Sequence, residues 1–170
     1  MRTVAHQIFR AEVFVAIASL ALASVVVPLS MDSSAVASSV SLCKAVTAAE
    51  VSKALGVKVS NESKQINGSV TVCWFKVGAN SQAVYVRSQT GDNASGYQSD
   101  LKAARTQQEH PKTDTKFAPY KAFSTSVGSP TYGFTYSVTV LKKSTELSVG
   151  AASVTLTKVE GLAKKVLPIL

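Results

Sequence analysis

The most regular alternation of polar and apolar residues lies over residues 132–140. Its apolar positions hold Tyr132, Phe134, Tyr136, Val138 and Val140. Glycine and hydroxyl residues fill the positions between them, and this period of two predicts a strand that buries one side. Residues 70–75 are largely apolar on both sides of such an alternation, which predicts a central strand. Shorter alternations predict further strands at 57–60, 83–88, 117–126 and 146–152.

Two segments in the first two thirds of the chain have helical spacing. Thr47 and Glu50 have the spacing of a capping box, in which each side chain accepts a hydrogen bond from the other residue's backbone N–H. Gly56 follows as a left-handed stop, so we predict a helix over 47–55. The apolar residues of 94–108 recur at i, i+4 and i+7, which predicts a second helix.

The C-terminal segment has the same signature. Thr157 and Glu160 form a second predicted capping box. An apolar stripe with helical spacing follows, made of Val159, Leu162, Ala163, Val166 and Leu167. We expect this stripe to pack across the sheet.

The order of these elements predicts an α+β fold. It reads helix, three strands, helix, two or three strands, helix, and Asn67 and Gly68 form a hairpin turn between two of the strands. Hairpin-linked strands form antiparallel sheets. We therefore predict a two-layer sandwich, with a largely antiparallel sheet of about five to six strands and three helices on one face.

The N-terminal segment has the features of a secretory signal peptide. Arg2 and Arg10 precede a stretch, residues 13–29, that contains no charged residue, and Ala35 and Ala37 supply small side chains for cleavage. The sequence thus predicts a signal peptide over 1–37 and a single secreted domain over 38–170. An uncleaved N-terminal membrane anchor is the alternative, because the stretch approaches the length that spans a bilayer.

Cys43 and Cys73 are the two cysteines of the chain. An even number of cysteines behind a secretion signal predicts a disulfide bond, and two cysteines allow one pairing. Two free buried thiols are the alternative.

The layout around these cysteines resembles a known group of proteins. Cys43 is followed by the Thr47–Glu50 helix start, by Leu55 and Gly56 at the helix end, and later by Cys73 and Trp74. This layout resembles the secreted proteins and lipoproteins of unknown function that are abundant in actinobacteria. The resemblance implies an extracytoplasmic compartment and a fold, but no activity and no site. The chain lacks the lipid-modified cysteine of the lipoprotein members.

Charge gives the most usable functional signal. The chain carries 18 Lys and Arg against 10 Asp and Glu, a formal net charge of +8. Such an excess favours either solubility alone or contact with an anionic partner. The candidate basic face consists of Lys142, Lys143, Lys158, Lys164 and Lys165. Its expected partner is an anionic cell-envelope polymer, a lipid headgroup or a protein. Nucleic acid is not expected, because the aromatic residues have core spacing and do not alternate with the basic ones.

Nucleotide-binding and catalytic motifs are absent from the sequence. Gly91 and Gly96 have the glycine spacing of a phosphate-binding loop, but Tyr97 and Gln98 stand where lysine and Ser or Thr are required. His110 is the only histidine after residue 37, and we interpret it as a solvated residue at a helix end. An enzyme that uses His110 remains an alternative hypothesis.

Metal ligands are not expected either. We interpret Asp92 and Asp100 as a helix cap and part of a solvated helix face, and the acidic residues as too scattered for a metal site. The sequence therefore predicts no catalytic residue, no metal and no cofactor.

A non-catalytic binding module, secreted or on the outer face of the cell envelope, is the function that these patterns favour. The alternative is a carrier or sensor that holds a small apolar ligand between sheet and helices. Its pocket would be lined by Trp74, Tyr132, Phe134 and Tyr136. The same aromatic residues would otherwise be ordinary core.

Overall fold

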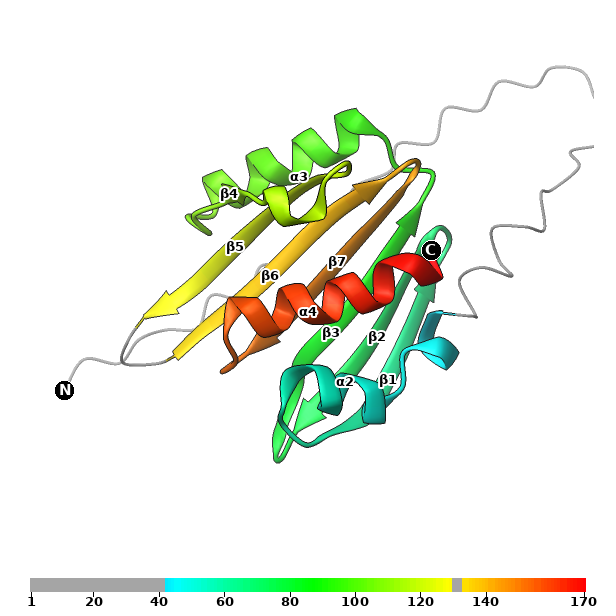
Figure 1. Cartoon of the computed structure of the whole chain (residues 1–170), viewed down its shortest axis with the longest axis vertical. Coiled ribbons are helices and arrows are strands. Elements are labelled where there is room, and N and C mark those ends of the chain that lie inside the picture. The colour runs from blue at the N-terminus through cyan, green and yellow to red at the C-terminus, as the bar shows by residue number, and fades with distance from the viewer. Residues whose placement is uncertain (1–41, 130–132) are drawn as a thin grey trace, which may run out of the picture. The chain divides into compact units, whose positions relative to one another are not determined.

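The computed structural model describes residues 42–129 and 133–170. The predicted signal peptide and Tyr132 lie outside the described residues. Within these residues a seven-stranded antiparallel sheet forms the centre of the fold, with helices packed against it (Figure 1). The chain therefore has the predicted α+β organisation.

The elements follow one another in the predicted order. The strands are β1 (Val59–Asn67), β2 (Val70–Val77), β3 (Asn80–Thr90), β4 (Lys112–Thr113), β5 (Lys121–Ser129), β6 (Gly133–Lys142) and β7 (Thr145–Ala152). The helices are α2 (Ala48–Leu55), α3 (Ala94–Thr106) and α4 (Leu156–Val166), with the 3₁₀ turns η1 (Thr115–Phe117) and η2 (Leu167–Ile169). A further helical turn covers residues 42–45.

The sheet has the strand order β1-β2-β3-β7-β6-β5-β4. It consists of two antiparallel meanders, β1-β2-β3 and β5-β6-β7, which β3 and β7 join at the centre. Seven strands exceed the predicted five to six, since β4 is two residues long and carries no alternation for the sequence to reveal. The edge strand β1 extends to Asn67, well past its predicted end, and exposes every residue after Val59.

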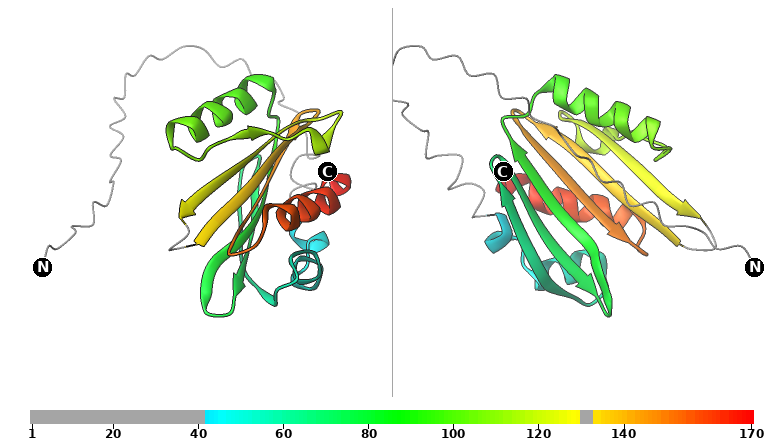
Figure 2. Two further views of the ribbon diagram at one scale, coloured as in Figure 1. Left: turned by 60° about the vertical axis from the view of Figure 1, so that its left-hand side comes forward. Right: turned by 180° about the vertical axis from the view of Figure 1, so that it is seen from behind.

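Helices cover both faces of the sheet, and the prediction that they share one face is wrong (Figure 2). We call the face under α2 and α4 the first face. Ala122 of β5 points into the core on that face, so its neighbour Phe123 points to the second face. There Phe123 and Leu141 form an apolar patch, on which Tyr97 and Ala104 of α3 pack. The apolar stripe of α3 thus finds its partner on the second face.

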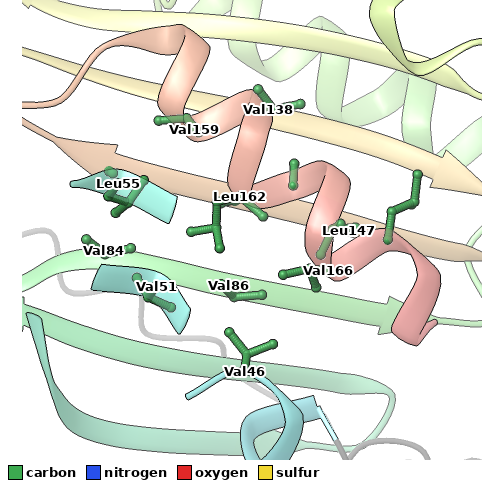
Figure 3. Packing of buried hydrophobic residues seen from close by; sticks show 14 of the residues in the cluster. Val46, Val51, Leu55, Val84, Val86, Val138, Leu147, Val159, Leu162 and Val166 are labelled. Carbon is green, nitrogen blue, oxygen red and sulfur yellow. The ribbon is translucent and has the colours of Figure 1, made fainter. Parts of the chain in front are cut away.

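The main core lies between the first face and the helices α2 and α4 (Figure 3). Val86 of β3 and Leu147 of β7 have an exposed fraction of 0%. Leu162 and Val166 of α4 belong to the same buried cluster (Figure 3), and α4 contacts β6 and β7, which confirms that the C-terminal stripe packs across the sheet. Other residues of the same core are also 0% exposed, among them Val51, Leu55, Val84, Val138 and Val159.

The two predicted capping boxes have different outcomes. Thr47 and Glu50 make both reciprocal hydrogen bonds at the start of α2, and Gly56 ends the helix with φ 66°. The second box is wrong: α4 starts after Thr155, whose side chain caps nothing. Glu160 cannot fold back to the helix start because it is buried and binds Lys116 instead.

The predicted disulfide bond is present. Cys43 and Cys73 are joined, and their Cα atoms lie 5.5 Å apart. The bond fastens the segment before α2 to the second strand of the sheet. Among the described residues, no helix is long and apolar enough to cross a membrane.

Removal of the disulfide should lower the free energy of unfolding by about 3.5 kcal/mol, because a loop with a sequence separation of 30 residues is no longer closed in the unfolded chain. Urea denaturation of the Cys43→Ala/Cys73→Ala variant, compared with the oxidised protein, measures this loss. An intact mass that does not rise by a pair of hydrogens on reduction would contradict the bond itself.

Gly150 permits a close contact at the centre of the sheet. It lies directly opposite Tyr85 in the β3–β7 ladder, and a Cβ atom at position 150 would overlap the Tyr85 ring. We expect Gly150→Ala to lower the free energy of unfolding by about 1–3 kcal/mol, since the ring must move.

The matched control is Gly161→Ala in α4, where a Cβ atom would meet nothing within 4 Å. This change should raise the free energy of unfolding by about 0.5–1 kcal/mol through helix propensity alone. Urea denaturation compares the two variants. Equal changes of the same sign in the free energy of unfolding of the two variants would contradict the close contact between Gly150 and the Tyr85 ring.

Candidate functional site

The structure separates the five lysines of the predicted basic face. Lys142, at the end of β6, and Lys164 of α4 line one hollow. Lys165 lines a different hollow beside Glu50 of α2. Lys143 is exposed in the turn after β6, and the Lys158 side chain lies against Gly56. Two of the five lysines therefore share a site.

The hollow that holds Lys142 and Lys164 has a volume of about 480 Å³. We call it the basic hollow. Its lining residues are Lys116, Phe117, Ala118, Tyr120, Lys142, Lys164, Leu167 and Pro168. The lysines come from η1, β6 and α4, so three separate elements bring positive charge to one place.

Lys116 forms an ion pair on this hollow. Its Nζ lies 2.7 Å and 2.8 Å from the two carboxylate oxygens of Glu160. The hydrogen bond to Glu160 raises the pKa of Lys116, so the ammonium form is favoured. Glu160 is 5% exposed, while Lys116 keeps 55% of its side-chain surface in solvent. The ammonium group can therefore contact a further anion from the solvent side.

The other two lysines are also held in place. Lys142 Nζ donates to the Leu167 carbonyl oxygen at 2.9 Å, after the end of α4. Lys164 Nζ lies 5.6 Å from the centre of the Phe117 ring, which is a cation–π distance. Glu160 pairs with the Lys116 ammonium group, and Asp114 accepts the Lys116 backbone N–H and adds a nearby negative charge. These two acids and the three lysines leave a formal charge of +1 at the hollow.

Sequence reasoning missed Lys116. It lies in the segment 112–121, which is polar and has no period of two or 3.6 residues. The lysine reaches the hollow because β5 pairs with β6 and thereby places η1 beside the end of α4. No local signal in the sequence marks that proximity.

A second group of charges lies on the other side of the sheet. Asp92, Asp100 and Glu146 each bring a carboxylate oxygen within 4.8 Å of the others. We call these three residues the acidic cluster. The prediction that the acidic residues are too scattered to form a cluster is wrong for this group, since β7 returns to pair with β3 and carries Glu146 to the start of α3.

Glu146 is the most buried member of the cluster, with an exposed fraction of 0%. Its Oε1 accepts a hydrogen bond of 2.8 Å from Arg87, whose other terminal nitrogen donates to Gln89. Its Oε2 meets no N–H or O–H donor. Burial, followed by the charge of Asp100, raises the pKa of Glu146 to about 7, although Arg87 acts in the opposite direction.

Asp92 and the start of α3 complete the cluster. Asp92 is 7% exposed, and its Oδ1 accepts the Asn93 N–H at 2.7 Å. Asn93, not Asp92, is the residue that caps α3, with its side chain accepting from two backbone N–H groups. Burial, with a smaller contribution from Glu146, raises the pKa of the nearby Tyr97 to about 12.

The structure does not bring Trp74, Phe134 and Tyr136, the described residues of the predicted aromatic pocket, together around one cavity. Phe134 and Tyr136 stack with ring centres 5.9 Å apart, and Tyr136 packs on the core of the first face. Trp74 alternates with the core residues Cys73 and Phe75, and so points to the second face, where it contacts Tyr85. Trp74 and Tyr136 therefore do not line one cavity.

His110 lies after α3. It is exposed and has a φ of 46°. Its imidazole thus lies at the surface of the described structure and takes no part in either group of charges.

No relative of this protein was found among known proteins. The chain matches no protein-family model, no curated protein and no solved structure.

The raised pKa of Glu146 predicts a specific pH dependence of stability. Between its ordinary value of 4.5 and about 7, the unfolded chain has lost the proton that the folded protein keeps. The free energy of unfolding should therefore fall as the pH rises through this window. Glu146→Gln removes the buried charge, so we expect the variant to be about 2–3 kcal/mol more stable than the native protein near pH 8. Below about pH 4.5 the difference should disappear.

Urea denaturation across this pH range, in buffer without divalent cations, measures the effect. Glu109→Gln is the control, because it removes a carboxylate outside the cluster. The prediction would be contradicted if the free energy of unfolding varied with pH in the same way in the native protein and in Glu146→Gln.

Proposed function

We propose that the protein is a non-catalytic binding module of the cell envelope or the secreted fraction, and that the basic hollow binds an anionic envelope component. The observation that carries this proposal is the convergence of Lys116, Lys142 and Lys164 on one hollow. A positive excess is available to a partner, because Glu160 and Asp114 offset two of the three lysine charges.

The contacts of the lysines support a binding role. Each ammonium group is already held by a carboxylate, a carbonyl or an aromatic ring. A site that is ordered before binding loses less side-chain entropy when the ligand arrives. The exposed residues Ala118 and Pro168 add apolar surface beside the charges. The hollow thus suits a phosphate or carboxylate group that is attached to a less polar body.

The compartment is part of the same proposal. The Cys43–Cys73 bond is typical of proteins in oxidising environments. Together with the predicted signal peptide over 1–37, it supports secretion or display on the outer face of the envelope. A lipid headgroup, an acidic polymer or an acidic protein segment would each present the required charge.

A carrier of a small apolar ligand is the second candidate. A hollow of about 200 Å³ lies between α2 and α4, and Val46, Leu162 and Val166 contribute apolar surface to it. Salt distinguishes the two candidates, since added ions screen charge contacts but do not weaken apolar burial.

Two pairs of neighbouring lysines allow a matched test of the basic hollow. Lys142→Gln/Lys164→Gln removes two charges from the hollow, and Lys143→Gln/Lys165→Gln removes two charges from adjacent positions outside it. Both variants have the same net charge. If each lysine contributes about 1 kcal/mol at an anionic surface, the first variant should bind about thirtyfold more weakly and the second almost normally.

Binding is measured by co-sedimentation with isolated cell envelopes, and with phosphatidylglycerol or phosphatidylcholine vesicles, at low and high salt. Binding to envelopes that high salt abolishes is the expected result. Vesicle binding would indicate a lipid headgroup as the partner, and its absence would indicate a polymer or protein. Equal loss in both variants would contradict a localised site, and binding that high salt leaves unchanged would favour the apolar carrier.

A further inference from the structure

The acidic cluster lies where three parts of the chain meet. Asp92 precedes α3, Asp100 is on α3, and Glu146 is near the start of β7. Gly96 and Asp100 are four residues apart on α3 and lie on one helical face, and Asp92 lies just before the helix. A Cβ atom at position 96 would overlap Asp92 Oδ1, so the glycine leaves room for the carboxylate above the helix. The backbone is thus arranged to bring acidic groups together.

A second observation concerns the burial and hydrogen bonding of Glu146. Glu146 is 0% exposed, and its Oε2 has no hydrogen-bond donor. A buried carboxylate oxygen without a donor is costly, and native proteins rarely contain one. Arg87 occupies Oε1 only, and its second contact goes to Gln89. The nearest acidic neighbour of Glu146 is Asp100, so a group that carries positive charge would contact both carboxylates.

We propose that the acidic cluster is a binding site for one Ca²⁺ ion, with carboxylate oxygens of Asp92, Asp100 and Glu146 as protein ligands. The three carboxylates and Arg87 have a formal charge of −2, which one divalent cation would neutralise. Oxygen-only ligands are those that Ca²⁺ and Mg²⁺ prefer. The site shares no residue with the basic hollow, so it stands or falls separately from the proposed function.

Ca²⁺ suits this cluster better than Mg²⁺. The three oxygens lie within 4.8 Å of one another but come from three separate positions in the chain. Ca²⁺ tolerates irregular ligand geometry, whereas Mg²⁺ requires a near-ideal octahedron of oxygens at about 2.0–2.1 Å. We therefore expect Ca²⁺ to bind in preference to Mg²⁺.

The exposed Asp100 gives the ion a route from solvent. Three protein ligands are fewer than the six to eight oxygens that Ca²⁺ takes, so water completes the shell on that side. A small ligand set of this kind corresponds to a weak site, with a Kd of about 10⁻⁴–10⁻³ M. Such a site would be filled only where free Ca²⁺ is abundant.

The test uses the purified protein with its disulfide formed and its bound metal removed with chelator. Thermal unfolding is followed as CaCl₂ or MgCl₂ is added at constant ionic strength, and equilibrium dialysis with ⁴⁵Ca²⁺ gives the stoichiometry. We expect one Ca²⁺ per chain and a saturable rise in Tm of about 3–5 °C at ten times the Kd. Mg²⁺ should produce a smaller rise.

Three variants locate the site. Asp100→Asn changes an exposed side chain and removes a charge that repels Glu146, so it should fold normally, have a Tm without Ca²⁺ no lower than that of the native protein, and bind Ca²⁺ at least tenfold more weakly. Glu146→Gln should abolish binding, and Glu109→Gln should bind as the native protein does. The proposal is overturned if Ca²⁺ gives no saturable rise in Tm, or if Asp100→Asn binds Ca²⁺ unchanged. Equal responses to Ca²⁺ and Mg²⁺ that survive in Asp100→Asn would show general charge screening and would also overturn it.

Discussion

Seven residue pairs join β3 to β7, and this antiparallel ladder turns two separate meanders into one continuous sheet. The pairing connects segments that lie about sixty residues apart in the chain, as the Arg87–Glu146 separation of 59 illustrates. It pairs Val86 with Val149, both fully buried on the first face, and it places Gly150 under the Tyr85 ring. Without it, neither meander could supply a surface wide enough for the main core.

The sheet carries different charges on its two faces. On the second face the β3–β7 ladder brings Glu146 to Arg87 and to the acidic residues around α3. On the first face the pairing of β5 with β6 places Lys116 beside α4, where Lys164 shares the basic hollow with it. The two proposed sites therefore share no residue.

The lysines of the basic hollow have structural roles in addition to the recognition role proposed for them. Lys116 compensates the buried Glu160, and Lys142 satisfies the Leu167 carbonyl oxygen, which lies at a helix end where carbonyl groups lack helical partners. A carboxylate that is buried without its partner is strongly destabilising. These contacts fix the positions of the ammonium groups, and they also mean that the fold depends on residues that would contact a ligand.

Local patterns in the sequence determined the element order, the capping box at Thr47, the packing stripe of α4 and, through two cysteines, the disulfide. Each of these depends on residues a few positions apart or on a count of one residue type. The acidic cluster, the Lys116–Glu160 pair and the placement of α3 on the second face were decided by tertiary structure. Their members lie far apart in the chain, and strand order sets their proximity. No local pattern specifies strand order, because it follows from which apolar faces pack together once the chain is folded.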